Sequence, residues 1–170
     1  MKNLFLLIGP SGVGKSKTVS RLKLSDNFVV YKLDDLICKY NYENHISEYF
    51  GRIGNQAFFH KSKEAIERAS LENFDKIIII DVGAGSIDFE MCLDYYSQFN
   101  TILLIADKEI IYQRIKNRSE KEARTFEEYV ESEFKPHKAK LFNSANYKID
   151  TSRLSIEEAS IELKNILKKE

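Results

Sequence analysis

The stretch GPSGVGKS, from Gly9 to Ser16, combines glycines, a lysine and a hydroxyl, and it matches the pattern G-x-x-x-x-G-K-[ST] in full. Glycines let such a loop fold tightly, so that successive backbone N–H groups surround anionic oxygens. The lysine would reach the terminal phosphates of a nucleotide, and the serine hydroxyl would be offered to Mg²⁺. The nucleotide-binding residues predicted from this loop are Gly12, Val13, Gly14, Lys15, Ser16 and Lys17. A glycine-rich turn without a ligand is the alternative.

Two aspartates follow apolar runs that are typical of buried strands. Asp81 ends the run KIIIID, where an aspartate could hold the hydration shell of Mg²⁺ beside Ser16. Asp34 lies just past the run NFVVYKL, where it could orient an acceptor hydroxyl or take its proton. The alternative is structural, because Asp34 or Asp35 could cap the next helix and Asp81 the next turn.

Three arginines surround a polar stretch between two expected helices. The stretch spans residues 117–125 and predicts a mobile lid. Arg114, Arg118 and Arg124 are candidates to reach the nucleotide or the transferring phosphoryl group, whose charge arginines stabilise. Arg118 is taken as catalytic together with Lys15 and Asp34. A merely solvated, charged face is the alternative for this region.

The elements that must position these groups alternate along the chain. Short apolar runs predict strands near residues 3–8, 27–33, 76–81, 100–106 and 146–150. Helical spacing predicts helices after the phosphate loop, over 46–70 with a possible break at Gly51–Gly54, near 87–98, over 108–118, over 125–142 with an interruption near Pro136, and after Ser155. This order predicts a three-layer α/β/α fold with a five-stranded parallel sheet. Ligands bind such sheets at the carboxyl ends of the strands.

Composition narrows the class of protein. The 170 residues fit a single domain over 1–170, and 26 basic residues balance 26 acidic ones. We therefore expect no nucleic-acid partner, and the short apolar runs predict no membrane span. The chain starts too close to its first strand for a signal peptide, and its two cysteines form no disulfide framework. We expect a cytoplasmic protein, and a monomer.

A phosphate loop does not by itself name a reaction. GTPases share it, but they also need a guanine-reading N-K-x-D motif, which the sequence lacks. Their D-x-x-G motif is missing too, because Ala84 stands three residues after Asp81. A small-molecule or nucleotide kinase is the simplest class that remains.

Several stretches together resemble the shikimate kinase family. They are KLDDLI, ISEYFGRIGNQAFF, the GAG at 83–85, YQRIKNR, HKAKLF and IDTSRLSIEE, and they occur in the family's order over nearly all of the chain. The resemblance implies a P-loop kinase with a small lid, an acceptor-binding helical segment over about 34–70, ATP and Mg²⁺ as cofactors, and a small hydroxylated acceptor. Within the last stretch, Arg153 is predicted to lie against adenine.

The same resemblance assigns the acceptor site and shows where this sequence departs from the family. The residues implied to contact the acceptor are Asp34, Phe59, Gly83, Ala84, Gly85 and Lys138. Phe59 and Lys138 stand where the family has substrate-binding arginines, and neither reproduces a bidentate guanidinium. Lys32 replaces an aspartate that the family ties to Mg²⁺.

Three functions stay open at this point. The first is ATP-dependent phosphorylation of a hydroxyl by a shikimate-kinase-like enzyme. The second is a kinase for another small acceptor, such as a polyol, a sugar acid or a nucleotide. The third is a nucleotide-binding regulatory protein that transfers nothing.

Overall fold

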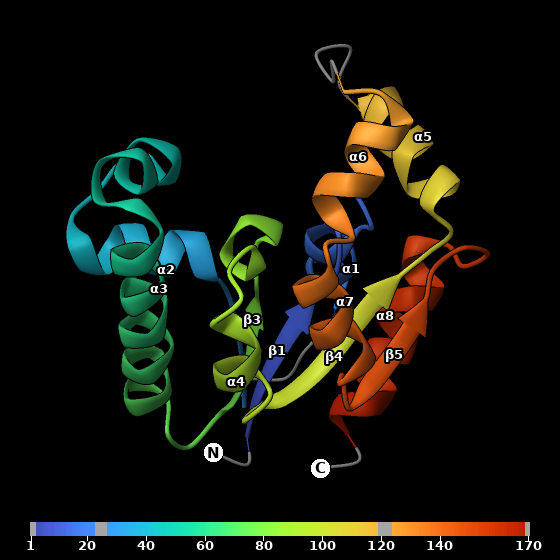
Figure 1. Cartoon of the computed structure of the whole chain (residues 1–170). Coiled ribbons are helices and arrows are strands. Elements are labelled where there is room, and N and C mark those ends of the chain that lie inside the picture. The colour runs from blue at the N-terminus through green and yellow to red at the C-terminus, as the bar shows by residue number, and fades with distance from the viewer. Residues whose placement is uncertain (1–2, 23–26, 119–123, 169–170) are drawn as a thin grey trace.

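Five parallel strands form one sheet in a computed structural model that describes residues 3–22, 27–118 and 124–168. The strands lie in the order β2-β3-β1-β4-β5, with both chain ends at the same edge of the molecule (Figure 1). Their bounds are Leu4–Ile8 (β1), Phe28–Lys32 (β2), Ile77–Asp81 (β3), Asn100–Ile105 (β4) and Tyr147–Asp150 (β5). The predicted five-stranded parallel sheet is therefore confirmed.

Side chains of the central strands alternate between two buried layers, as the two-residue period of a strand requires. Leu4, Leu6 and Ile8 of β1 join one core cluster, while Phe5 and Leu7 join the other. The helices within residues 33–72, 92–96 and 136–143 contribute to the first cluster, and those within residues 15–20, 108–118, 126–133 and 156–167 pack against the second. The sheet is thus covered on both faces, which confirms the three-layer architecture.

The helices carry the start and stop signals found in the sequence. Their bounds are Lys15–Ser20 (α1), Leu33–Asn41 (α2), Ile46–Glu72 (α3), Cys92–Tyr96 (α4), Lys108–Arg118 (α5), Phe126–Glu133 (α6), Pro136–Asn143 (α7) and Ile156–Leu167 (α8). The break expected in the long helix lies at Gly54, which has φ +74°. Pro136 occupies the first turn of α7 and separates it from α6, because proline lacks the N–H that an uninterrupted helix needs. Ser155 and Glu158 form the capping box that starts α8.

The helix expected near 87–98 is shorter than its pattern suggests. The chain first makes a 3₁₀ turn, η1 (Ala84–Ile87), and only then α4. The Sγ of Cys92 and the hydroxyl of Tyr96 both donate to the carbonyl of Ser86, at 3.2 Å each. These buried contacts hold the turn against α4 and favour it over a continuous helix.

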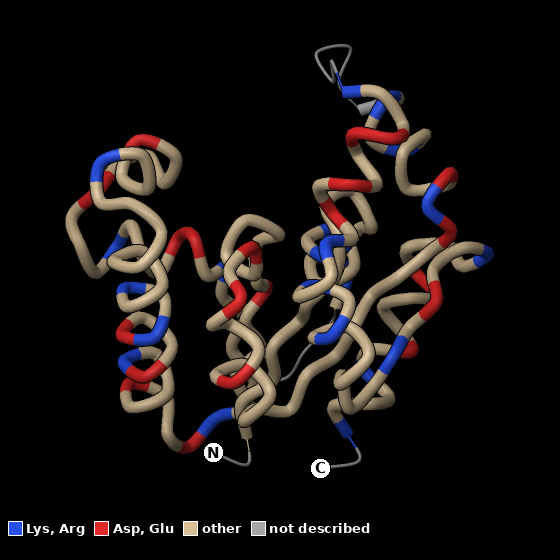
Figure 2. Tube along the Cα trace, viewed as in Figure 1, with Lys and Arg blue, Asp and Glu red and all other residues tan. Residues whose placement is uncertain are grey.

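Charged residues of both signs are mixed along the chain, for example in α3 (Figure 2). Among the described helices, none is both long and apolar enough to cross a membrane.

The sheet register places the chemistry-bearing strand ends side by side. Asp81 at the end of β3 pairs in register with Leu7 of β1 and with Lys32 of β2. The phosphate loop leaves β1 at this edge, and α2 leaves β2 there. The carboxyl edge of the sheet therefore brings Lys15, Asp34 and Asp81 into one region.

Candidate active site

The phosphate loop has the backbone conformation that its glycines permit. Gly12 has φ +83°, and a Cβ built there would lie 2.3 Å from Cγ1 of Ile115. Gly14 has φ +110° and immediately precedes α1. A residue with a side chain would be strained at both positions and would also strike α5 at Gly12. The loop is therefore built for backbone groups to approach a ligand closely.

Lys15 folds back over this loop. Its Nζ donates to the carbonyl oxygens of Gly9, at 2.8 Å, and Pro10, at 3.3 Å. Burial lowers the pKa of Lys15, while the charges of Asp81 and Glu133 oppose that shift. The amine is thus held at the loop by neutral carbonyl oxygens, and the anionic oxygens of a bound phosphate could take their place.

Ser16 and Asp81 meet across the loop. The Ser16 hydroxyl donates to Oδ2 of Asp81 at 2.6 Å, and the aspartate is only 6% exposed. Magnesium prefers such oxygen ligands, and in kinases it binds through one or two side chains together with phosphates and water. The structure shows no group of three or more His, Cys, Asp or Glu suited to a metal among the residues it describes. The pair therefore fits a magnesium site that depends on a bound nucleotide.

A cavity of about 760 Å³ opens over the phosphate loop. On one side it is lined by Lys32, Asp34 and Asp81, and on the other by Thr151, Leu154 and Ile156. The first side is polar and lies at the ends of β2 and β3, whereas the second is formed by the segment that leads into α8. The cavity thus joins a polar acceptor side to a more apolar side suited to a nucleotide base.

Asp34 lies in the first turn of α2 and faces this cavity. Its Oδ1 accepts a hydrogen bond from Ser86 Oγ at 3.3 Å, and a Cβ at Gly83 would lie 3.0 Å from Oδ2. Burial raises the pKa of Asp34, and the charges of Asp35 and Asp81 add to that rise, although the Ser86 hydrogen bond opposes it. A carboxyl with a raised pKa is suited to accept a proton.

The structure brings only part of the expected acceptor site to the cavity. Gly83 and Ala84 line it, but Gly85 and Phe59 are not among the lining residues of the described chain. Phe59 is 7% exposed, and its ring contacts Tyr95 and Tyr96 edge to face, with centroids 5.9 Å and 6.4 Å away. We therefore assign Phe59 to the core between α3 and α4.

The predicted arginines also differ in whether they line the cavity. Arg114 lines the cavity, where its guanidinium donates to the Thr151 carbonyl at 2.7 Å and to the Thr151 hydroxyl at 3.1 Å. Arg153 is exposed and is not part of the described lining. The side chain of Arg118 and most of the expected lid, residues 119–123, lie outside what the structure describes.

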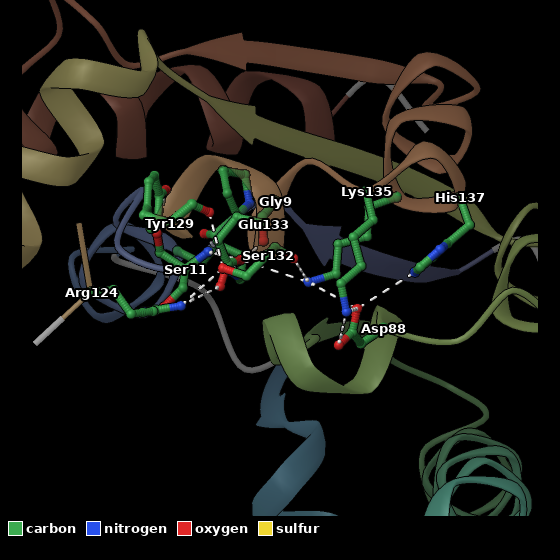
Figure 3. A network of polar contacts seen from close by, with 12 residues as sticks. Gly9, Ser11, Asp88, Arg124, Tyr129, Ser132, Glu133, Lys135 and His137 are labelled. Carbon is green, nitrogen blue, oxygen red and sulfur yellow. Dashed lines mark hydrogen bonds and ion pairs between the residues drawn. The ribbon is translucent and has the colours of Figure 1, made fainter. Parts of the chain in front are cut away.

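Residues of α6 bind the tip of the phosphate loop, and sequence reasoning missed this contact. The N–H of Ser11 donates to Glu133 Oε2 at 3.0 Å, and the Tyr129 hydroxyl donates to the Ser11 carbonyl at 3.1 Å (Figure 3). Glu133 is 6% exposed, and Arg124 lies 3.7 Å from its Oε1. No sequence signal separates Glu133 from the neighbouring glutamates, because only the fold buries it.

Lys138 is also buried, and its neighbours are acidic. Its Nζ donates to the Ser132 carbonyl at 3.2 Å and lies 3.4 Å from Oδ1 of Asp88 and 3.8 Å from Oε2 of Glu133. Lys138 is not among the described residues that line the cavity, and it is ion-paired with Asp88 and Glu133, two residues of the network in Figure 3. The sequence predicted Lys138 as a site residue, but it gave no indication of Asp88 or Glu133.

Solved structures with the same fold include shikimate kinases and a tunicamycin resistance protein. The shikimate kinase from Aquifex aeolicus is 24% identical with a TM-score of 0.72, and the two chains are covered to 97% and 96%. The shikimate kinase from Acinetobacter baumannii, solved in complex with shikimate, is 18% identical with a TM-score of 0.72 and coverage of 99% and 94%. A tunicamycin resistance protein from Deinococcus radiodurans has 14% identity, a TM-score of 0.66 and coverage of 98% and 96%.

These identities are low enough that the structural likeness shows the fold alone. No curated protein matches the sequence closely enough to count as a relative. The family model of shikimate kinase, however, matches residues 11–168, which include most of the phosphate loop and every strand after β1. This chain, whose phosphate loop opens onto a cavity lined by Asp34 and Asp81, therefore belongs to the shikimate kinase family.

Proposed function

We propose that this protein transfers the γ-phosphoryl group of ATP, with Mg²⁺, to a hydroxyl group of a small molecule. The observation that carries the proposal is that Lys15, the Ser16–Asp81 pair and Asp34 all line one cavity. Family membership independently supports kinase-type transfer. The acceptor comes from the shikimate-like class of hydroxylated molecules or from another small alcohol.

Each residue has a separate task in this scheme. The loop amides and Lys15 bind the phosphates, and Arg114 joins the loop to the segment before α8 by donating to the carbonyls of Val13, at 3.4 Å, and Thr151, at 2.7 Å. Ser16 and Asp81 would hold Mg²⁺, which neutralises charge that develops on the phosphate oxygens. Asp34 orients the acceptor hydroxyl and takes its proton. Because phosphoryl transfer depends mainly on positioning and charge stabilisation, no further nucleophile is needed.

The setting we propose is that of a soluble cytoplasmic enzyme that works as a monomer. Cys38 and Cys92 are both free, in keeping with a reducing compartment.

The proposal is tested by ADP release from ATP and Mg²⁺ with a panel of hydroxylated acceptors. A kinase gives ADP only when a suitable acceptor is present, and Lys15→Ala should lower that rate by about 100-fold or more. Lys168→Ala, an exposed lysine near the C-terminus, is the matched control. Tight ATP binding without acceptor-dependent ADP release would instead identify a regulatory nucleotide-binding protein.

A further inference from the structure

The buried ammonium of Lys138 makes one hydrogen bond and two ion pairs with groups of this chain. A lysine has three N–H donors and no acceptor. Three oxygens lie around Nζ: the Ser132 carbonyl at 3.2 Å, Asp88 Oδ1 at 3.4 Å and Glu133 Oε2 at 3.8 Å. Because Lys138 is 3% exposed and is not among the described residues that line the cavity, its charge is shielded from a ligand there.

Asp88 and Glu133 are themselves held in place. Lys135 donates to Asp88 at 2.9 Å, and Nε2 of His137 lies 3.5 Å from the same carboxylate (Figure 3). Burial alone would raise the pKa of Asp88, but the Lys135 hydrogen bond and the charges of Lys138 and Lys135 bring it below the ordinary value. No hydrogen bond of good geometry reaches Oδ1 of Asp88 within the described chain, so the ion pairs satisfy that oxygen.

Glu133 is anchored from the opposite side. It accepts the N–H of Ser11 and lies near Arg124, so it cannot leave Lys138 without losing its hold on the phosphate loop. Removing one partner from a buried ion pair leaves an uncompensated charge, which proteins strongly disfavour.

This network is connected both to the phosphate loop and to the turn that holds Asp34. Ser11 belongs to the loop, whereas Asp88 directly follows η1, whose Ser86 is hydrogen-bonded to Asp34. The charges of Glu133, Lys138 and Asp34 all act on Lys15. Asp88, Glu133 and Lys138 are not among the described residues that line the cavity, so the network would act on an acceptor held by Asp34 through its charges and not by contact.

For an acceptor carboxylate, these surroundings are unfavourable. Asp34, Asp88 and Glu133 are like charges, and the charge of Lys138 is already balanced by its ion pairs with Asp88 and Glu133. Lys32 also lines the cavity but is exposed, and a hydrated surface charge contributes little to binding. Phe59, at the other position where the family has an arginine, is packed in the core.

We propose, building on the kinase function above, that the acceptor of this enzyme is an uncharged alcohol and not a hydroxy acid such as shikimate. Asp34, oriented by Ser86, receives its hydroxyl group, while the charges of the Glu133–Lys138–Asp88 network disfavour acids. The enzyme therefore discriminates against acids in two ways, in addition to binding the correct acceptor. Its carboxylates repel an acceptor carboxylate, and the charge of Lys138 is already paired within the protein.

The test compares pairs of acceptors in which one member carries a carboxylate and the other is an uncharged molecule of similar shape. Acceptor-dependent ADP release is measured for shikimate against its methyl ester, and for gluconate against sorbitol, within a wider panel of uncharged polyols and their acids. We expect kcat/KM to favour the uncharged members by at least about tenfold, because a carboxylate that leaves water without a cation to pair with loses its hydration uncompensated. Equal or better use of the acids would overturn the inference and leave the kinase function standing. No ADP release with any acceptor would overturn the kinase function itself.

Variants separate the network from other causes of the preference. Glu133→Gln keeps an acceptor for the Ser11 N–H but removes the charge beside Lys138, so it should lower the preference for uncharged acceptors by about tenfold. Asp88→Asn should act in the same direction. Glu131→Gln, an exposed position on the same helix, should leave the preference unchanged. Melting temperature and ATP affinity establish that the variants fold, and an unchanged preference in folded Glu133→Gln and Asp88→Asn would refute the role of the network.

Discussion

Replacing Asp81 by Asn tests the magnesium site most directly. The Asp81 carboxylate accepts the Ser16 hydroxyl at 2.6 Å, within the range of hydrogen bonds to a charged oxygen. Asn keeps the shape of the side chain and one acceptor oxygen, but it removes the charge. The variant therefore isolates the electrostatic part of the contact.

The size of the effect follows from this geometry. A hydrogen bond to a charged group contributes about 1.5–3 kcal/mol, which corresponds to about 10- to 150-fold in an equilibrium constant. Since Asp81 is 6% exposed, solvent does little to screen the loss. We expect the Mg²⁺ concentration for half-maximal activity to rise by that factor, and kcat to fall by about 100-fold.

The assay is acceptor-dependent ADP release at a series of Mg²⁺ concentrations, together with calorimetric ATP binding with and without Mg²⁺. Asp75→Asn is the matched control, because Asp75 is exposed and lies just before β3, at the opposite end of the same strand. ATP binding without Mg²⁺ should change little in either variant.

An unchanged Mg²⁺ dependence in folded Asp81→Asn would refute the assignment. The aspartate would then serve only to orient Ser16 and the loop. Equal losses with and without Mg²⁺ would also contradict it, since the defect would then lie in the phosphate loop.

Two further predictions concern Asp34 and the loop glycines. Because burial raises the pKa of Asp34, activity that needs its carboxylate should be lost on the acidic side at a higher pH than for an ordinary aspartate, as a pH profile of kcat/KM would show. The folded state disfavours the ionised form, so Asp34→Asn should abolish activity yet raise the melting temperature at neutral pH; a lower melting temperature would contradict this sign. Gly12→Ala should lower the free energy of unfolding by about 1–3 kcal/mol more than Gly14→Ala in urea denaturation, because both have positive φ but only Gly12 faces Ile115 at 2.3 Å. Equal losses would show that α5 yields to the new methyl group.

Much of the fold could be predicted because its signals are local. The five apolar strand runs, the break at Gly54, the separation at Pro136 and the capping box at Ser155 all depend on neighbouring residues. The helix expected near 87–98 was wrong in extent, because contacts of Ser86 with Cys92 and Tyr96 fix the turn before α4. Those contacts depend on burial, which periodicity does not encode.

The sequence by itself determined the phosphate loop, the alternation of strands and helices, and the placing of Asp34 and Asp81 after strands whose ends meet. Each of these follows from spacing over a few residues and from the geometry of a parallel sheet. The tertiary structure alone decided that Phe59 turns into the core, and that Lys138 is neutralised by Asp88 and Glu133. Glu133 and Ser11 are 122 positions apart, and only the packing of α6 against the loop brings them together. Long-range contacts between charges depend on how helices dock, and no local pattern in the chain specifies that docking.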